Sequence, residues 1–182
     1  MGFIKSGLFI SLDGVIEAPE MWSFPYFDGE IGQLKHDELL ATGAHLLGRV
    51  TYEGFSAAWP SRTDEQGFAQ RMNGLPKYVV STTLTRAEWN NSHVIKGDVA
   101  DEVTRLKQQA SGDILVAGSA TLVQTLTEHD LVDEYRLLVY PIALGSGKRL
   151  FGDTSRQVKL KLLETRSFAS GVVLQRYATD KA

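Results

Sequence analysis

Two turns built around glycine contain the residue types that bind phosphate groups. A glycine at the end of a strand lets backbone amides approach a phosphate, and the helix that follows directs its positive end to the same place. A guanidinium at the start of that helix can hold a phosphate through two parallel hydrogen bonds. Because the chain offers two such turns, we expect a dinucleotide as the ligand. The residues concerned are Gly48, Arg49 and Thr51 in the first turn, and Gly118, Ser119, Ala120 and Thr121 in the second.

A third polar segment follows a strand-like run at residues 77–81. Ser81, Thr82 and Thr83 form a cluster of hydroxyl groups at its carboxyl end, and Arg86 comes shortly after. In an open α/β sheet, ligands bind beyond the carboxyl ends of the strands. These groups can hold the 2′-phosphate of an adenine ribose, so they favour NADPH over NADH as the ligand.

Simpler interpretations of these segments stay open. Neither glycine turn fits the GxGxxG or the GxxxxGK[ST] pattern. Each glycine can equally make a tight connection from a strand to a helix, with Thr51 and Ser119 as helix caps. In the same way, Thr85 and Glu88 can form the capping box of a short helical turn, and this is compatible with phosphate binding nearby.

The elements that must position these residues alternate between strand-like and helix-like patterns. Predicted strands fall at residues 3–12, 44–48, 77–81, 93–96 and 113–117, and predicted helices at 28–42, 51–58, 65–72, 98–110 and 122–126. Three further strand-like segments, at 135–141, 158–165 and 171–177, have no helices between them. We therefore expect a single α/β domain over residues 1–182, with a mostly parallel sheet and an antiparallel edge at the C-terminal end.

Composition excludes several other classes of protein. The chain contains no cysteine, which rules out disulfides, cysteine-ligated metals and a cysteine nucleophile. Its 19 Lys and Arg residues are scattered among 22 Asp and Glu residues, which argues against nucleic acid as a partner. The four histidines lie far apart, so we expect no metal site. The N-terminal segment has neither a signal-peptide core nor a membrane span, and we expect a cytoplasmic protein.

Five segments, in chain order, resemble the dihydrofolate reductase-like superfamily. They are residues 11–14, 47–53, 81–83, 116–119 and 140–147. More closely, they are similar to the reductase domain of the bifunctional riboflavin-biosynthesis deaminase-reductase and to its stand-alone bacterial relatives. The resemblance implies a three-layer α/β/α fold, NADPH as cofactor and, frequently, a homodimer. It also implies hydride transfer to a small heterocycle, either similar to 5-amino-6-(5-phosphoribosylamino)uracil or similar to a pterin.

The resemblance also implies roles for the candidate residues. Arg49 and Thr51 would lie by the cofactor phosphates, residues 81–83 by the adenine-side ribose phosphate, and residues 118–121 over the pyrophosphate. The nicotinamide would lie near the first strand. Asp13 is then a candidate for orienting the substrate or relaying a proton. Two alternatives stay open, because Asp13 can simply belong to an Asp-Gly turn and water can supply the proton.

Four features leave the substrate and the activity open. The segment at residues 59–66 is mixed in charge where a riboflavin reductase presents basic residues, and no zinc-deaminase motif is present. The acidic residue expected on the helix after the first loop of a dihydrofolate reductase has three candidate matches in this sequence. The aromatic residues of the first loop can either cover the end of the sheet or form a lid over the nicotinamide and the substrate. A non-catalytic nucleotide-binding or structural protein that retains the fold is the alternative. The candidate acids are Asp28, Glu30 and Asp37, and the aromatic residues are Trp22, Phe24, Tyr26 and Phe27.

Overall fold

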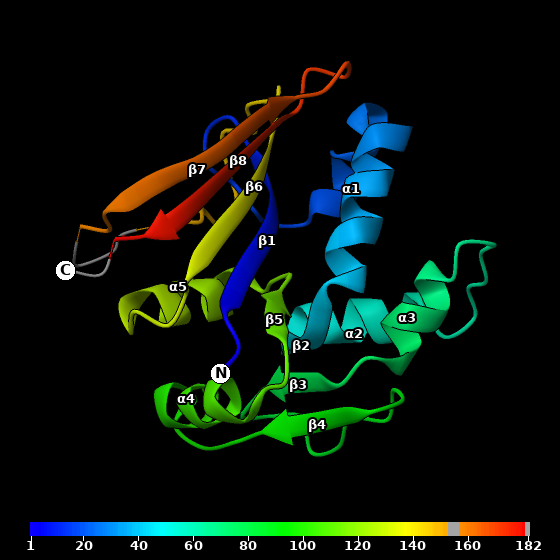
Figure 1. Ribbon diagram of the computed structural model, residues 1–182, viewed down its shortest axis with the longest axis vertical. Coiled ribbons are helices and arrows are strands. Elements are labelled where there is room, and N and C mark those ends of the chain that lie inside the picture. Colours follow the sequence, from blue (N-terminus) through cyan, green and yellow to red (C-terminus); the bar gives the residue numbers. More distant parts are fainter. Residues whose placement is uncertain (153–156, 181–182) are drawn as a thin grey trace.

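A mixed eight-stranded sheet forms the centre of the molecule (Figure 1). The computed structural model describes residues 1–152 and 157–180. The strands lie in the order β4-β3-β2-β5-β1-β6-β8-β7 across the sheet. Their bounds are β1 Ile4–Ser11, β2 Thr42–Gly48, β3 Lys77–Val80, β4 Ser92–Ile95, β5 Asp113–Val116, β6 Glu134–Tyr140, β7 Leu160–Ser167 and β8 Val173–Thr179.

Helices cover both faces of this sheet (Figure 1). One face carries α4 and α5, and the opposite face carries α1, α2 and α3. Two short 3-10 helices, η1 and η2, lie in the long loop after β1. The bounds are η1 Pro19–Met21, η2 Phe24–Tyr26, α1 Gly29–Leu40, α2 Arg49–Ala58, α3 Phe68–Gly74, α4 Val99–Gln109 and α5 Ala120–Glu128. The predicted three-layer α/β/α architecture is confirmed.

β1 is an inner strand of the sheet, and both of its faces are buried. It pairs in parallel with β5 on one side and with β6 on the other. A strand covered on both faces is predominantly apolar rather than alternating, which is the pattern of residues 3–12. The parallel order brings the carboxyl ends of β3, β2, β5, β1 and β6 to one edge of the sheet.

The C-terminal strands form the predicted antiparallel edge. β8 pairs antiparallel with both β6 and β7. β7 is the outermost strand, and its side chains are exposed or half-buried. Within the described residues, no helix lies between these three strands along the chain, and the predicted mixed sheet is confirmed.

The apolar core divides according to the two faces of the sheet. Alternate residues of β2 point to opposite sides, so that Leu46 joins the cluster under α4 and α5, whereas Leu47 joins the cluster with α1, α2 and α3. A third cluster is rich in aromatic rings and surrounds Tyr140 at the carboxyl end of β6. Among the described residues, no helix is both long enough and apolar enough to cross a membrane.

Local signals determine where the helices begin. Asp98 caps α4 as predicted, because its carboxylate accepts a hydrogen bond from the amide of Asp101 at 3.0 Å. The helix predicted at 65–72 begins later, at Phe68, because the Asp64 carboxylate accepts hydrogen bonds from the amides of Gln66 and Phe68 and holds residues 64–67 in a turn. No helix forms at residues 82–89, so the capping box proposed for Thr85 and Glu88 is wrong.

Candidate functional site

The candidate site lies at the edge where the parallel strands end. Because β3, β2, β5, β1 and β6 are neighbours in that order, the segments that follow them form a row. Phosphate-binding candidates therefore lie on one side of the row and the segment around Asp13 on the other. The strands end, in order along the edge, at Val80, Gly48, Val116, Ser11 and Tyr140.

The two glycine turns touch each other. The amide of Gly48 donates a hydrogen bond to the carbonyl oxygen of Gly118 at 3.1 Å. A Cβ atom on Gly48 would lie 2.2 Å from Oγ of Ser119, and one on Gly118 would lie 2.8 Å from Oγ1 of Thr51. Gly118 also has a positive φ of 129° and is joined to Ser119 by a cis peptide bond. The contact between the turns thus leaves no room for a side chain at either glycine.

The helices that begin at these turns have amide groups without a side-chain cap. Gly48 and Ser119 occupy the N-cap positions of α2 and α5, and neither helix has a capping hydrogen bond from a side chain. By contrast, Asp28 caps α1 and Asp98 caps α4. Ser119 is thus the N-cap residue of α5, as predicted, although its side chain makes no capping hydrogen bond, whereas the prediction of Thr51 as a cap is wrong because Thr51 lies inside α2. Free amides at two neighbouring helix N-termini fit an anionic ligand such as a pyrophosphate.

Arg49 and the hydroxyl cluster flank these two turns. The Arg49 guanidinium is about half exposed and pairs with Glu53 one turn along α2, at 2.9 Å. Ser81 is buried, and its Oγ accepts hydrogen bonds from the amides of Thr83 and Leu84, which fixes the turn after β3. Thr82 and Thr83 are exposed. The structure thus leaves Arg49 and the two threonines accessible to a ligand, while Ser81 shapes the turn.

Asp13 holds two loops together. Its carboxylate accepts hydrogen bonds from the Ser11 hydroxyl at 2.6 Å and from the amides of Leu144 and Gly145 at 3.1 and 2.8 Å. The Ser11 hydrogen bond, followed by those two amides, holds the pKa of Asp13 well below its ordinary value. The group is therefore an ionised acceptor that ties the loop after β6 to the end of β1. A direct role of Asp13 toward a substrate stays a prediction.

Tyr140 is a candidate that the sequence did not reveal. Its ring packs against Phe9, Trp22 and Tyr26, with centroids 5.2, 5.4 and 6.0 Å away. Its hydroxyl is buried and has no hydrogen-bond partner among the described residues. Burial, and next the charge of Asp28, raise the pKa of this hydroxyl, which keeps its proton. Trp22 and Tyr26 of the first loop thus cover the end of β6, and their opening as a lid stays a prediction.

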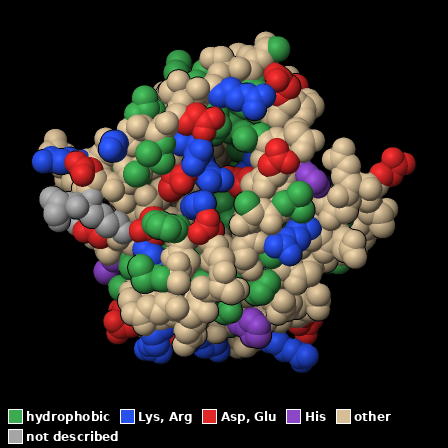
Figure 2. All heavy atoms as spheres, in the orientation of Figure 1, with side chains coloured by type: hydrophobic (Ala, Val, Ile, Leu, Met, Phe, Trp, Pro, Cys, Tyr) green, Lys and Arg blue, Asp and Glu red, His purple; other side chains and the backbone are tan. Residues whose placement is uncertain are grey.

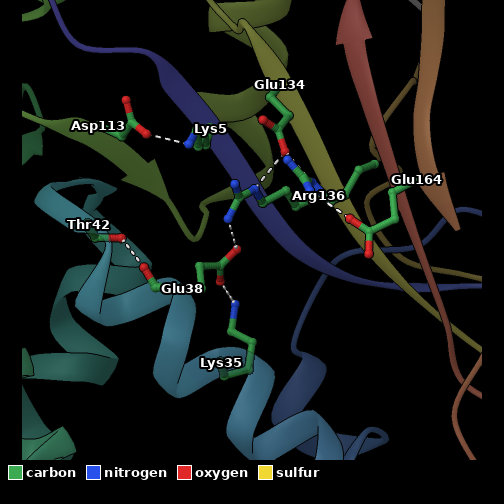
Figure 3. A network of polar contacts seen from close by, with 9 residues as sticks. Lys5, Lys35, Glu38, Thr42, Asp113, Glu134, Arg136 and Glu164 are labelled. Carbon is green, nitrogen blue, oxygen red and sulfur yellow. Dashed lines mark hydrogen bonds and ion pairs between the residues drawn. The ribbon is translucent and has the colours of Figure 1, made fainter. Parts of the chain in front are cut away.

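A charged hollow lies between α1 and the strands β6, β8 and β7. Its volume is about 80 Å³. Figure 2 shows acidic and basic side chains gathered around it. Figure 3 shows the network itself, in which carboxylates and cations alternate from the helix across the sheet. The residues that line the hollow are Leu8, Leu34, Lys35, Glu38, Arg136, Leu138, Glu164, Leu174 and Arg176.

Two buried carboxylates hold this network together. Burial raises the pKa of Glu38, but the charges of Lys35 and Arg136 outweigh it, and the pKa lies below its ordinary value. Burial likewise opposes ionisation of Glu134, and hydrogen bonds from Arg176 and Arg136 lower its pKa below the ordinary value. Both carboxylates are therefore ionised, and neither holds a proton near neutral pH.

Glu38 is the acidic residue of α1 that faces the sheet, and the sequence analysis did not name it. The three acids it did name lie elsewhere: Asp28 caps the helix, Glu30 pairs with Arg166 at the surface, and Asp37 accepts a hydrogen bond from Gln33. The signal that could have found Glu38 is its spacing from Ile31 and Leu34 on one helix face. Among the described residues, no three His, Asp or Glu side chains gather as a metal site.

Strand order, helix layers and the edge of uncapped helix N-termini together define an α/β protein of the dihydrofolate reductase-like fold. Within that class the chain belongs to the RibD C-terminal domain family, whose model matches residues 3–174. YyaP of Bacillus subtilis (strain 168) is 33% identical over 172 residues, which covers 91% of this chain and 89% of YyaP. Membership in this family supports a reductase type of function.

Solved structures support the same fold. A putative riboflavin biosynthesis protein from Shewanella sp. PV-4 superposes with a TM-score of 0.75 at 19% identity, and the match covers 100% of both chains. A dihydrofolate reductase from Enterococcus faecalis, complexed with NADP(H), has a TM-score of 0.66 at 16% identity over 99% of this chain and 98% of that chain. These likenesses establish the architecture of the protein.

The contact between the glycine turns predicts a large difference between two glycine substitutions. Gly48→Ala should lower the free energy of unfolding by about 1–3 kcal/mol, because the new methyl group collides with Ser119. Gly54→Ala is the control: it lies in α2 with no atom near its Cβ position, and it should raise stability by about 0.5–1 kcal/mol. Urea unfolding measures both values. Equal stability of the wild type and Gly48→Ala would show that the turns are not in tight contact.

The hydrogen bonds of Asp13 predict a pH-dependent contribution to stability. Because its pKa is depressed in the folded state, the carboxylate stabilises the protein above the unfolded-state pKa of about 4, and this contribution is lost as the pH falls through the folded-state value. Asp13→Asn should therefore lower the Tm near neutral pH, and its difference from the wild type should shrink below about pH 4. Glu20→Gln, at an exposed position, is the control. A difference in Tm that does not depend on pH would contradict this assignment.

Proposed function

We propose that the protein is an NADPH-dependent reductase that transfers a hydride to a small heterocyclic substrate. The observation that carries this proposal is the pair of touching glycine turns, at which two helices begin without side-chain caps. This arrangement offers a dinucleotide two sets of free backbone amides in one place. Arg49 stands at the start of α2, where its guanidinium can exchange Glu53 for a cofactor phosphate.

The turn after β3 supports NADPH rather than NADH. Thr82 and Thr83 present exposed hydroxyl groups there, and the Arg86 side chain is 82% exposed and only loosely paired with Glu88, at 3.8 Å. A 2′-phosphate needs hydrogen-bond donors and a cation of this kind. The Enterococcus dihydrofolate reductase, which shares the fold, is complexed with NADP(H).

Reduction of a C=N or C=O bond requires a proton as well as a hydride. NADPH, when bound, supplies the hydride. Asp13 is ionised and fully engaged by hydrogen bonds, whereas the Tyr140 hydroxyl keeps its proton and lies on the strand next to β1. We assign the Tyr140 hydroxyl as the hydrogen-bond donor that polarises the reacting nitrogen or oxygen atom of the substrate, and we assign the proton itself to water, because a hydroxyl with a raised pKa is a weak acid. The first loop must move Trp22 aside for the substrate to reach it.

The substrate we propose is similar to 5-amino-6-(5-phosphoribosylamino)uracil or to a pterin. Family membership and the name of the Shewanella relative, a putative riboflavin biosynthesis protein, support the first of these. A homodimer and a cytoplasmic location remain part of the proposal. The outermost strand β7 leaves Leu162 and Leu163 about half exposed, which is the kind of edge that a second copy can cover.

Nucleotide binding is the first test. Calorimetry should find that NADPH binds at least about tenfold more tightly than NADH, because only NADPH carries the 2′-phosphate. Arg49→Ala should weaken NADPH binding roughly ten- to hundredfold, the value of a charge-assisted contact. Arg105→Ala removes a comparable exposed arginine from α4 and should leave binding unchanged. Failure of the wild type to bind either nucleotide would contradict the reductase proposal, and NADPH binding without turnover of either substrate would favour the non-catalytic alternative.

Tyr140→Phe separates a catalytic hydroxyl from a structural one. Because the hydroxyl has no partner, its removal should leave the Tm unchanged or slightly higher. With 5-amino-6-(5-phosphoribosylamino)uracil or dihydrofolate as substrate, the variant should lower kcat by about a hundredfold or more while NADPH affinity stays constant. A lower Tm combined with an unchanged kcat would show that the hydroxyl serves the fold.

A further inference from the structure

Arg136 has hydrogen-bond donors that the described part of the chain does not use. Its Nε donates to Oε1 of Glu134 at 2.7 Å, and this is its one hydrogen bond among the described residues. Nη1 lies 3.6 Å from Oε1 of Glu38, which is an ion-pair distance but is too long for a hydrogen bond. The side chain is only 19% exposed, and it lines the hollow beside α1. A half-buried guanidinium with N–H groups that no described residue uses can bind a further acceptor.

Arg176 is held beside Arg136 by the same carboxylate. Its Nε also donates to Oε1 of Glu134, at 2.7 Å, so one oxygen atom anchors both guanidinium groups (Figure 3). From the other side, Nη1 of Arg176 donates to Oε2 of Glu164 at 2.7 Å. The two guanidinium groups therefore lie next to each other at the hollow, which both side chains line.

Glu164 is the carboxylate of this network that can leave most easily. Its side chain is 42% exposed, it lies on the outermost strand, and its one ion pair among the described residues is with Arg176. A half-exposed pair of this kind contributes little to stability. Glu38, by contrast, is 8% exposed and is bound by both Lys35 and Arg136. A ligand that displaces Glu164 thus breaks one weak contact and leaves the buried part of the network intact.

Charge and size point to a small anion. The network holds three cations, Lys35, Arg136 and Arg176, against the carboxylates Glu38, Glu134 and Glu164. With Glu164 turned out to solvent, one positive charge is left unbalanced beside the apolar side chains that line the hollow. A volume of about 80 Å³ is well below the roughly 300–1,000 Å³ of a pocket for a whole ligand, so it suits a single acidic group.

We propose that this hollow binds an oxyanion, a carboxylate or a phosphate group, between the guanidinium groups of Arg136 and Arg176. The carboxylate of Glu164 occupies the same position on Arg176 and is a built-in competitor of the anion. This site is separate from the phosphate-binding edge at Gly48 and Gly118, and its existence does not depend on the proposed reductase activity. In a purely structural network, Glu164 would have no influence on anion binding.

The test measures anion binding to the whole chain by NMR, from backbone amide shifts of β6, β7 and β8. Inorganic phosphate and malonate are titrated separately at constant ionic strength, so that the preferred kind of oxyanion is identified. Glu164→Gln should strengthen binding at these strands about two- to fivefold, because it removes the competitor and no cation. Arg176→Gln should weaken it at least about tenfold. Arg49→Ala should leave these shifts unchanged, which separates the hollow from the nucleotide edge.

A second ion pair on the same strand provides matched controls. Arg166 of β7 pairs with Glu30 at 3.0 Å, with exposures similar to those of the Arg176–Glu164 pair. Glu30→Gln and Arg166→Gln should therefore change surface charge in the same way without altering the affinity of the hollow. Equal affinities for Glu164→Gln and the wild type, or shifts confined to the first turns of α2 and α5, would overturn the proposal. Glu164→Gln retains every cation of the network, so its affinity for the anion tests the proposal even if Arg176→Gln does not fold.

Discussion

The candidate nucleotide edge depends on the parallel pairing of β2 with β5. This pairing brings together two turns that are far apart in the sequence, and the hydrogen bond between Gly48 and Gly118 fixes their contact. As a result, the positive ends of α2 and α5 lie side by side without an acidic cap on either. Two like ends that converge in this way repel each other, and an anion between them relieves the repulsion. The geometry thus favours phosphate groups before any side chain contributes.

The charged network under α1 follows the opposite principle. At the glycine turns, donors are left free, whereas under α1 charges are paired in an alternating chain from Lys35 to Glu164. Burying charges costs free energy that pairing does not always recover, so such a chain is weak evidence for stability alone. The network is also uneven, because the buried Glu134 is bound by two arginines, whereas the half-exposed Glu164 is bound by one. That unevenness is what makes the hollow a candidate site.

Local features of the sequence predicted much of the fold. The apolar periods located every strand, and Asp98 predicted the start of α4, since a cap depends on residues that are neighbours in the chain. The glycine turns were also found locally. The charged network could not be found in this way, because it joins Glu38 to Arg136 across about half of the chain. Tyr140 escaped for a similar reason, since a tyrosine in an apolar strand gives no sign that its hydroxyl lacks a partner.

Asp13 and Tyr140 differ in how they can act on a substrate at this edge. Three hydrogen bonds stabilise the charged form of the Asp13 carboxylate, whereas burial stabilises the neutral form of the Tyr140 hydroxyl. Stabilising the carboxylate as an anion makes it a firm anchor but a poor acid. The Tyr140 hydroxyl, in turn, has no acceptor for its O–H group among the described residues. A substrate that brings an acceptor atom to it therefore gains a hydrogen bond. Because Trp22 of the first loop packs edge-on against the Tyr140 ring, that hydroxyl stays buried as long as the loop keeps this position.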